Sequence, residues 1–185
     1  MRVISGKAKG FKLRPVPGEG TRPIMDRVKE SLFNIIGADI EGASLWDLFG
    51  GTGSVGIEAL SRGAAYVRFV DKSQAAIKTI QANLKSTRLA GENVEVIRAD
   101  ALTYLRRDPD RRFEYSYIAP PQHKTLWHEA LLAFDARPGW LSPDAWVIAQ
   151  IHPVEYKPMS LKNLVEFDQR RYGSTLLVFF ERTEA

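Results

Sequence analysis

The chain has 185 residues, a length that predicts one domain with a sizeable core. Hydrophobic residues make up 44% and charged residues 26%, as in ordinary globular proteins, and the absence of cysteine excludes disulfides, thiolate metal sites and a cysteine nucleophile. The net charge of +4 lies in the N-terminal segment, because residues 1–30 carry eight Lys or Arg against three acidic residues. Such clustered cations suit a phosphate backbone, although a solvated basic face is an equal alternative.

The N-terminus has charges and glycines where a signal peptide would have its apolar stretch, and no apolar run reaches the length of a membrane span. We therefore expect a cytoplasmic protein with no membrane partner. The three histidines are not spaced like metal ligands, so no metal site is predicted.

The first expected elements form an N-terminal extension over residues 1–37. Residues 2–5 and 11–14 read as a β-hairpin around a turn between Gly6 and Gly10, and prolines and glycines at 15–20 predict a loop. Val28, Leu32 and Ile36 share one face of a helix expected over 26–36, with Gly37 as its end.

Strands and helices then alternate. Strands are expected at 45–49, 66–70, 94–97, 113–118 and 145–151, and helices at 55–61, 74–88, 101–106 and along the stripe Trp127, Ala130, Leu131 and Phe134. Two further strands, 165–170 and 175–180, predict a closing antiparallel hairpin at the sheet edge. The pattern predicts an α/β fold with a doubly wound, mostly parallel, seven-stranded sheet.

Chemistry is expected just after the strands, because an open parallel sheet binds its ligands beyond the carboxyl ends of its strands. Residues 50–53, Asp71, Asp100 and residues 119–122 occupy those positions. A single acidic residue there is often only a helix N-cap, but acids after three successive strands indicate a ligand site.

The glycine loop at 51–56 matches the G-x-G-x-x-G pattern of dinucleotide binding, followed by Asp71 at a distance that suits a ribose. Asp47 argues against NAD, because a carboxylate and a pyrophosphate a few ångströms apart repel by roughly 1–4 kcal/mol. S-adenosylmethionine (SAM) carries a sulfonium and an ammonium instead. We therefore favour SAM, with Asp71 accepting from the ribose hydroxyls and Asp100 from the adenine amine; an NAD-dependent oxidoreductase is the weaker alternative.

Residues 47–53, 69–71, 99–101 and 119–122 resemble the ordered motifs of class I, Rossmann-like SAM-dependent methyltransferases. Residues 2–7, 9–10, 22–23, 26–33, 56–64 and 172–173 further resemble the RsmD family of 16S rRNA (guanine-N2)-methyltransferases. The resemblance implies methylation of the exocyclic N2 amine of a guanosine in the small ribosomal subunit by a monomer, with residues 38–185 as the methyltransferase domain.

The site residues expected from these arguments fall into three groups. The cofactor is assigned to Asp47, Phe49, Gly50, Gly51, Thr52, Gly53, Asp71, Lys72, Ser73, Asp100 and Ala101. RNA binding is assigned to six cations of the basic extension: Lys7, Lys9, Lys12, Arg14, Arg22 and Arg27. The catalytic motif is Ala119, Pro120, Pro121 and Gln122.

The catalytic motif departs from the family, since amino-methylating enzymes carry Asp or Asn before the two prolines and an aromatic residue after them. Ala119 cannot accept a proton from an amine, so we expect the carbonyl of Pro120 to serve as the fixed acceptor. Two alternatives stay open: a catalytically impaired protein that binds SAM and RNA, and an amino-methyltransferase for another RNA or DNA base.

Overall fold

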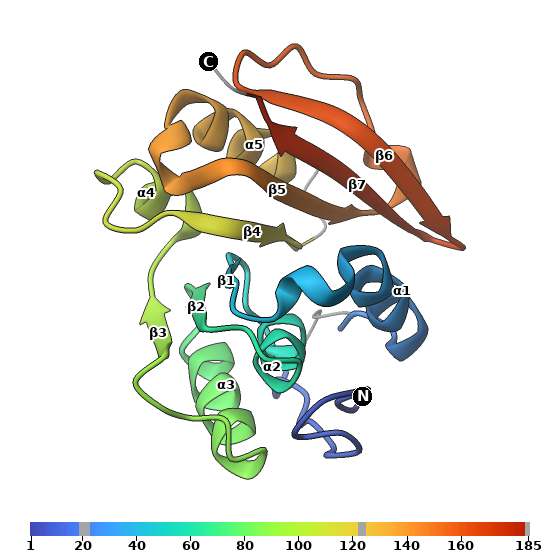
Figure 1. The fold of residues 1–185 in the computed structure, drawn as a ribbon, viewed down its shortest axis with the longest axis vertical. Helices are drawn as coiled ribbons and strands as arrows, with labels where there is room; N and C mark the ends of the chain where they lie inside the picture. Colours follow the sequence, from blue (N-terminus) through green and yellow to red (C-terminus); the bar gives the residue numbers. More distant parts are fainter. Residues whose placement is uncertain (19–22, 122–124, 184–185) are drawn as a thin grey trace.

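Seven strands form one sheet in the order β3-β2-β1-β4-β5-β7-β6 in the computed structural model, which describes residues 1–18, 23–121 and 125–183 (Figure 1). The strands are β1 (Ser44–Asp47), β2 (Tyr66–Asp71), β3 (Val94–Arg98), β4 (Phe113–Ile118), β5 (Leu141–Ile151), β6 (Leu164–Tyr172) and β7 (Thr175–Arg182). β7 runs antiparallel to both of its neighbours, and the other pairings are parallel. The expected doubly wound, mostly parallel sheet with a closing hairpin is confirmed.

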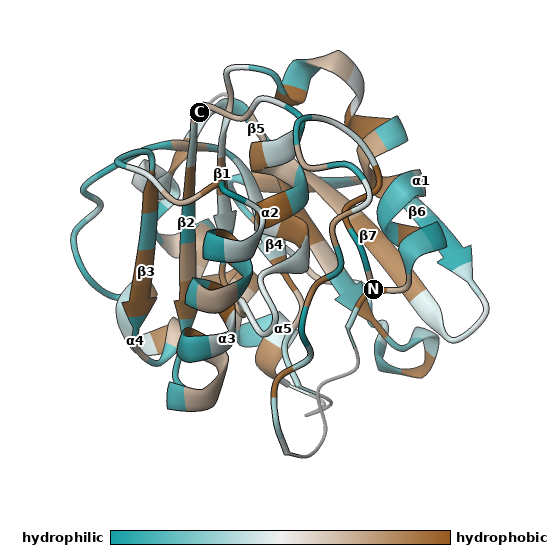
Figure 2. Cartoon of the chain, turned by 90° about the horizontal axis from the view of Figure 1, so that it is seen from below, coloured by the Kyte–Doolittle hydropathy of each residue, from teal (hydrophilic) through white to brown (hydrophobic). Residues whose placement is uncertain are grey.

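Helices cover both faces of the sheet. They are α1 (Asp26–Ile36), α2 (Ser54–Ser61), α3 (Gln74–Ser86), α4 (Ala101–Leu105) and α5 (Leu126–Ala136), with short 3-10 turns η1 (Gly37–Ile40), η2 (Pro138–Trp140) and η3 (Pro153–Glu155). α1, α2 and α3 share one apolar core with the sheet, and α4 and α5 share the other. Figure 2 shows brown, apolar strands between helices that carry teal, polar segments. Such burial on both faces stabilises a parallel sheet.

Most expected bounds differ from the observed ones by one or two residues, and the strand expected at 45–49 ends at Asp47. The strand expected at 145–151 begins earlier, at Leu141, because β5 pairs Leu141 with Phe113 and then shifts register before Trp146 pairs with Tyr115. The helix expected to reach residue 88 ends at Ser86, and Arg88 has a φ of 60°. The N-terminal hairpin is reduced to a single antiparallel bridge, between Arg2 and Lys12.

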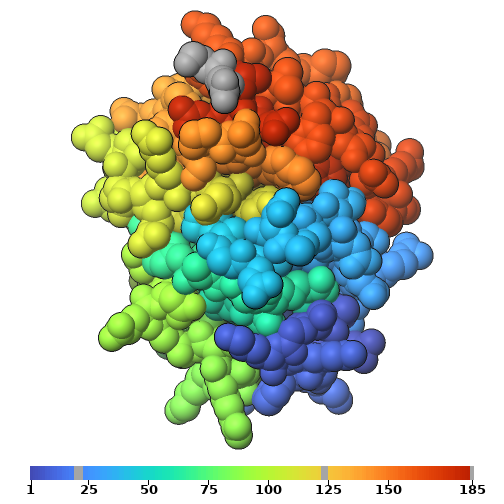
Figure 3. Space-filling model, viewed as in Figure 1, coloured from blue at the N-terminus to red at the C-terminus, as the bar shows by residue number. Residues whose placement is uncertain are grey.

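The N-terminal segment, dark blue in Figure 3, is anchored on α2 by hydrogen bonds from its backbone amides. The amides of Ile4 and Ser5 donate to the Glu58 carboxylate at 2.8 and 3.1 Å, and the amide of Lys7 donates to the carbonyl of Ser61 at 2.8 Å. The extension therefore contacts the helix that follows the glycine loop. The expected boundary between the N-terminal extension and the methyltransferase domain, between residues 37 and 38, stays a prediction. Val3, Ala8 and Leu13 of the extension pack in the same core as α2.

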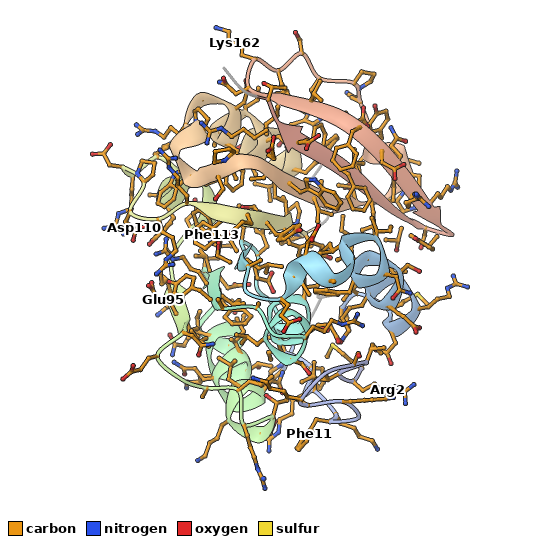
Figure 4. The ribbon with its side chains drawn as sticks, viewed as in Figure 1. Arg2, Phe11, Glu95, Asp110, Phe113 and Lys162 are labelled. Carbon is orange, nitrogen blue, oxygen red and sulfur yellow. The ribbon has the colours of Figure 1, made fainter. Side chains whose placement is uncertain are left out.

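A buried guanidinium lies on the face of the sheet that α4 and α5 cover. Arg68 of β2 is 1% exposed and donates to both carboxylate oxygens of Asp110 at 2.9 Å, with Glu95 at 3.4 Å. Its guanidinium also lies over the rings of Trp46, Tyr104 and Phe113. Figure 4 shows Glu95, Asp110 and Phe113 gathered on one side of the molecule. The charged groups of this cluster pair with one another. None of them lines the cavity described below.

No helix in the described part of the chain is both long enough and apolar enough to cross a membrane.

Candidate SAM and substrate site

A cavity of about 750 Å³ opens at the carboxyl ends of the parallel strands. Its walls come from the ends of β1, β2, β4 and β5, from the glycine loop, and from residues 99–102 after β3. Residues 23–25, just before α1, and Ser174 and Thr175, at the turn into β7, also line it. The volume lies within the range of small-molecule and cofactor sites.

The glycine loop turns sharply between β1 and α2. Gly50 donates to the carbonyl of Val70 at 2.8 Å, and Gly53 donates to the carbonyl of Gly50 at 2.8 Å. Gly51 and Gly53 have φ values of 55° and 80°, which L side chains rarely adopt. A Cβ at Gly56 would lie 2.3 Å from the ring of Phe69, so this glycine lets α2 pack closely on β2. The loop backbone is therefore held at the floor of the cavity.

Asp47 ends β1 and is 2% exposed. The amide of Gly56 donates to its Oδ2 at 3.1 Å. Burial raises the pKa of Asp47 well above its ordinary value, and the nearby negative charge of Asp71 adds to this. A cation placed in the cavity beside Asp47 would favour its ionised form, whereas a phosphate would oppose it.

Asp71 ends β2, and both of its oxygens are fixed by backbone amides. Gly51 donates to Oδ2 at 2.9 Å, and Ser73 donates to Oδ1 at 2.8 Å. Each carboxylate oxygen has a second lone pair, so the side chain is oriented and still able to accept two further bonds. A pair of neighbouring ribose hydroxyls fits this arrangement.

Asp100 caps α4 and also lines the cavity. Its Oδ1 accepts from the amide of Thr103 at 3.0 Å and from the Thr103 hydroxyl at 3.1 Å. The backbone bond from Thr103 lowers the pKa of Asp100. Both of these bonds use one oxygen, so a helix-capping role for Oδ1 and a ligand-binding role for Oδ2 are compatible.

The end of β4 carries Ala119, Pro120 and Pro121, all of which line the cavity. Below them lies Tyr117, 3% exposed, whose hydroxyl is hydrogen-bonded to Oε1 of Gln150 from the neighbouring β5. Burial raises the pKa of Tyr117 well above its ordinary value, and Asp47 contributes in the same direction. The phenol therefore stays protonated and remains a hydrogen-bond donor.

The structure gathers most of the expected site residues around this one cavity. Those that line it are Asp47, Phe49, Gly50, Gly51, Thr52, Asp71, Lys72, Asp100, Ala101, Ala119, Pro120 and Pro121. Gly53 and Ser73 are not among the lining residues: Gly53 precedes α2, and the Ser73 side chain caps α3 by accepting from Ala76. Gln122 lies outside the described residues.

Sequence reasoning missed several polar lining residues, because it considered only the residues after the first four strands. The missed residues are Tyr117, Gln150, His152, Glu155, Ser174 and Thr175. The rule that found Asp71 and Asp100 would have pointed to His152, which follows the strand expected at 145–151, but not to Gln150, which lies within that strand.

The expected RNA-binding residues that the structure describes lie on the surface. Lys7, Lys9, Lys12, Arg14 and Arg27 are exposed, and none of them lines the cavity. Arg22 lies outside the described residues. One basic residue of the segment behaves differently: Lys29 is completely buried, so its charge is not available to a partner.

The profile of the protein family described as "Conserved hypothetical protein 95" matches residues 1–181. The chain is 38% identical to the Bacillus subtilis protein named "Putative rRNA methyltransferase YlbH", over 98% of this chain and 99% of that protein. It is 34% identical to "Ribosomal RNA small subunit methyltransferase D" of Haemophilus influenzae, over 81% of this chain and 78% of that protein.

A solved structure supports the same relationship. The Escherichia coli protein titled "Putative methyltransferase yhhF" superimposes with a TM-score of 0.87 at 27% sequence identity, over 98% of this chain and 97% of that one. With the profile match over nearly the whole length and relatives above 30% identity, the chain belongs to the family described as conserved hypothetical protein 95, which is the RsmD family that its motifs resemble.

Proposed function

We propose that this protein is a SAM-dependent rRNA methyltransferase that modifies the exocyclic N2 amine of a guanosine in the 16S rRNA of the small ribosomal subunit. The observation that carries the proposal is the convergence of Asp47, Asp71 and Asp100, from the ends of three adjacent strands, on one cavity beside the glycine loop. The relatives named as small-subunit rRNA methyltransferases support the choice of substrate.

The lining residues fit SAM better than a dinucleotide. The oriented carboxylate of Asp71 suits the ribose hydroxyls, and Asp100 suits the adenine amine. The buried carboxylate of Asp47 suits the positive charges of SAM and would repel a pyrophosphate. The amides of the glycine loop are used within the loop and toward Asp47 and Asp71, which makes them poorer partners for phosphate oxygens.

When bound, SAM supplies a methyl group on a sulfonium: the amine lone pair forms the N–C bond while the C–S bond breaks, its electron pair goes to sulfur, and the amine releases a proton to water. The chain must then hold the amine at the methyl carbon and orient its lone pair. Proximity of this kind supplies roughly 7–11 kcal/mol. The Pro120 carbonyl, on a loop stiffened by Pro121, is an acceptor suited to one amine hydrogen.

The exposed cations of residues 7–14 suit an RNA backbone, and the base to be methylated has to leave its stack to enter the cavity. Residues 1–37 would then serve as an RNA-binding extension of the methyltransferase domain, anchored through Glu58.

The test is transfer of labelled methyl from SAM to small subunits purified from cells that lack this activity, followed by mapping of the modified nucleotide. We expect one N2-methylguanosine. A label on another base, or on another atom of guanosine, would overturn the guanine-N2 assignment. Binding of NADH in place of SAM would overturn the cofactor assignment.

A second candidate is a protein that binds SAM and RNA without transferring methyl, and the observation in its favour is the methyl side chain of Ala119 at the end of β4. It predicts SAM binding with no product in a single turnover on unmodified subunits, whereas the methyltransferase predicts product.

A further inference from the structure

The described residues that follow β4, 119–121, offer no side-chain acceptor for an amine. Ala119 has only a methyl group, and Pro120 and Pro121 have neither polar side chains nor backbone N–H groups. A site that orients an amine lone pair needs acceptors held in fixed directions. Among the described residues, we therefore look for a side-chain acceptor on another strand that reaches the cavity.

The strand register brings Gln150 to this position. β4 and β5 are parallel, with Tyr117 opposite Ile148 and Ile118 opposite Ala149. Ala119 directly follows β4, and Gln150 directly follows Ala149 in β5. Successive side chains of a strand alternate between faces, so Gln150 points to the same face as Ile148 and its partner Tyr117. Ala119 packs against the core that contains Tyr117 and Ile148. Tyr117, Ala119 and Gln150 all line the cavity.

The carboxamide of Gln150 is held in place. The Tyr117 hydroxyl is hydrogen-bonded to its Oε1, and this hydroxyl is a donor because the phenol stays protonated. The backbone of Gln150 is fixed in the antiparallel pairing of β5 with β7, opposite Leu177. An amide oxygen has two lone pairs, so one acceptor position on Oε1 and the two hydrogens of Nε2 remain for a ligand.

The other missed polar residues of the cavity are less suited to this task. The side chains of His152 and Glu155 already accept hydrogen bonds within their own turn. His152 Nδ1 accepts from the amide of Val154 at 3.2 Å, and Glu155 accepts from the amide of His152 at 3.2 Å. Thr175 begins β7, which is separated from β4 by β5. Gln150 is the polar side chain that the sheet order places next to Ala119.

We infer that Gln150 binds the base to be methylated, its Oε1 accepting a hydrogen of the target amine and its Nε2 donating to the adjacent ring acceptor, and so supplies from β5 the acceptor that Ala119 does not supply from β4. This inference rests on the proposed amine methylation. An adjacent acceptor and donor match the N2–H and N3 edge of guanine, which makes Gln150 a residue that contacts substrate, with Tyr117 as its positioning residue.

The test is a rescue experiment in single-turnover methylation of unmodified small subunits. Gln150→Ala should lower the rate constant about 100-fold, the typical effect of losing one oriented hydrogen bond in such a site. Ala119→Asn in the Gln150→Ala background should restore most of that loss, because Asn at 119 supplies the acceptor from the neighbouring strand. Tyr117→Phe should give a smaller loss, and SAM affinity should stay within about 3-fold of the natural protein in all three.

Gln169→Ala is the matched control, since Gln169 lies on β6, is exposed and does not line the cavity. It should leave the rate unchanged. If Gln150→Ala loses SAM binding through misfolding, Gln150→Met, which keeps the length of the side chain and lacks the acceptor, replaces it with the same expected loss and rescue.

Unchanged methylation by the Gln150 variant, or a loss that Ala119→Asn does not rescue, would overturn this inference and leave the proposed function standing. No methylation by the natural protein, with SAM bound, would overturn the proposed function itself, and the role of Gln150 would fall with it.

Discussion

The Lys29 ammonium of α1 lies 3.4 Å from the Glu58 carboxylate of α2, and neither side chain is exposed to solvent. Lys29 also donates to the carbonyl of Arg2 at 2.6 Å and to the Ser54 hydroxyl at 2.9 Å. Burial lowers the pKa of Lys29, and the charge of Glu58 opposes that shift. The pair therefore joins three parts of the chain: the N-terminal segment, α1 and the helix that follows the glycine loop.

Removing one charge of this pair should be strongly destabilising. Glu58→Gln leaves the Lys29 ammonium buried without a counter-ion, and breaking such a pair costs about 3–5 kcal/mol. Urea unfolding should show a loss of that size in the free energy of unfolding. Glu92→Gln, at an exposed position, is the control and should change stability by less than about 0.5 kcal/mol. Equal effects of the two substitutions would contradict the structural role of the pair.

Gly6→Ala should destabilise more than Gly10→Ala. Both glycines have positive φ, 86° and 88°, so both substitutions carry a backbone cost of about 1–2 kcal/mol. Only at Gly6 would the added Cβ collide with another element, 1.9 Å from the carbonyl oxygen of Ser61. The difference between the two variants in urea unfolding measures the contact of the N-terminal segment with α2. A Gly6 variant as stable as the Gly10 variant would show that this contact is absent in solution.

SAM affinity should rise with pH through the raised pKa of Asp47. Below that pKa the carboxyl is protonated, and a cationic ligand has to release the proton as it binds. In the ligand-free protein, burial favours the protonated carboxyl of Asp47. The free energy of unfolding that this form contributes is therefore lost as the pH rises through the pKa of Asp47 in the folded protein. Calorimetry in two buffers of different ionisation enthalpy measures the proton release.

Asp47→Asn is the control for this pH dependence, because it keeps an oxygen for the Gly56 amide and cannot ionise. It should bind SAM with no proton release attributable to this position. The same proton release from Asp47→Asn and the natural protein would place the titrating group elsewhere.

Asp71→Ala should weaken SAM binding by at least about 100-fold. In the proposed SAM site it removes two charge-assisted bonds to the ribose, each worth about 1.5–3 kcal/mol, and it releases the Gly51 and Ser73 amides that bond to the carboxylate. Isothermal titration with SAM measures the change. Asp108→Ala, at a fully exposed aspartate, should bind SAM like the natural protein. An unchanged affinity for Asp71→Ala would mean that SAM binds at a different place.

Replacing the exposed cations of the N-terminal segment should weaken binding to small subunits and reduce its dependence on salt. The salt slope should fall by roughly 0.7–0.9 for each phosphate that the segment no longer neutralises, while SAM affinity stays unchanged. The residues to replace by Ala are Lys7, Lys9, Lys12 and Arg14.

The control removes the same number of exposed positive charges elsewhere. Figure 4 shows Lys162 at the opposite end of the molecule from Arg2 and Phe11. The control set is Arg106, Arg107, Arg137 and Lys162. An equal fall in the salt slope for both sets would mean that binding to small subunits depends on the net charge of the protein alone. The N-terminal segment would then have no special role.

Local patterns in the sequence are enough to predict the order of strands and helices and the acidic residues that follow successive strands. The aromatic-rich segment 113–118 is a pattern of this kind, and the observed β4 has the same bounds. Parallel strands of an open sheet end at one edge, so the sequence alone predicts that Asp47, Asp71 and Asp100 meet there.

The environment of each side chain, in contrast, is a property of the tertiary structure. Lys29 counts in the sequence as one of the basic residues of the N-terminal segment, but it is buried against Glu58 from a helix that begins 25 residues later. Gln150 and Ala119 are 31 positions apart in the chain and line the same cavity because β5 pairs with β4. Burial, ion pairing and strand pairing depend on contacts between distant segments, which the periodicity of a single segment does not encode.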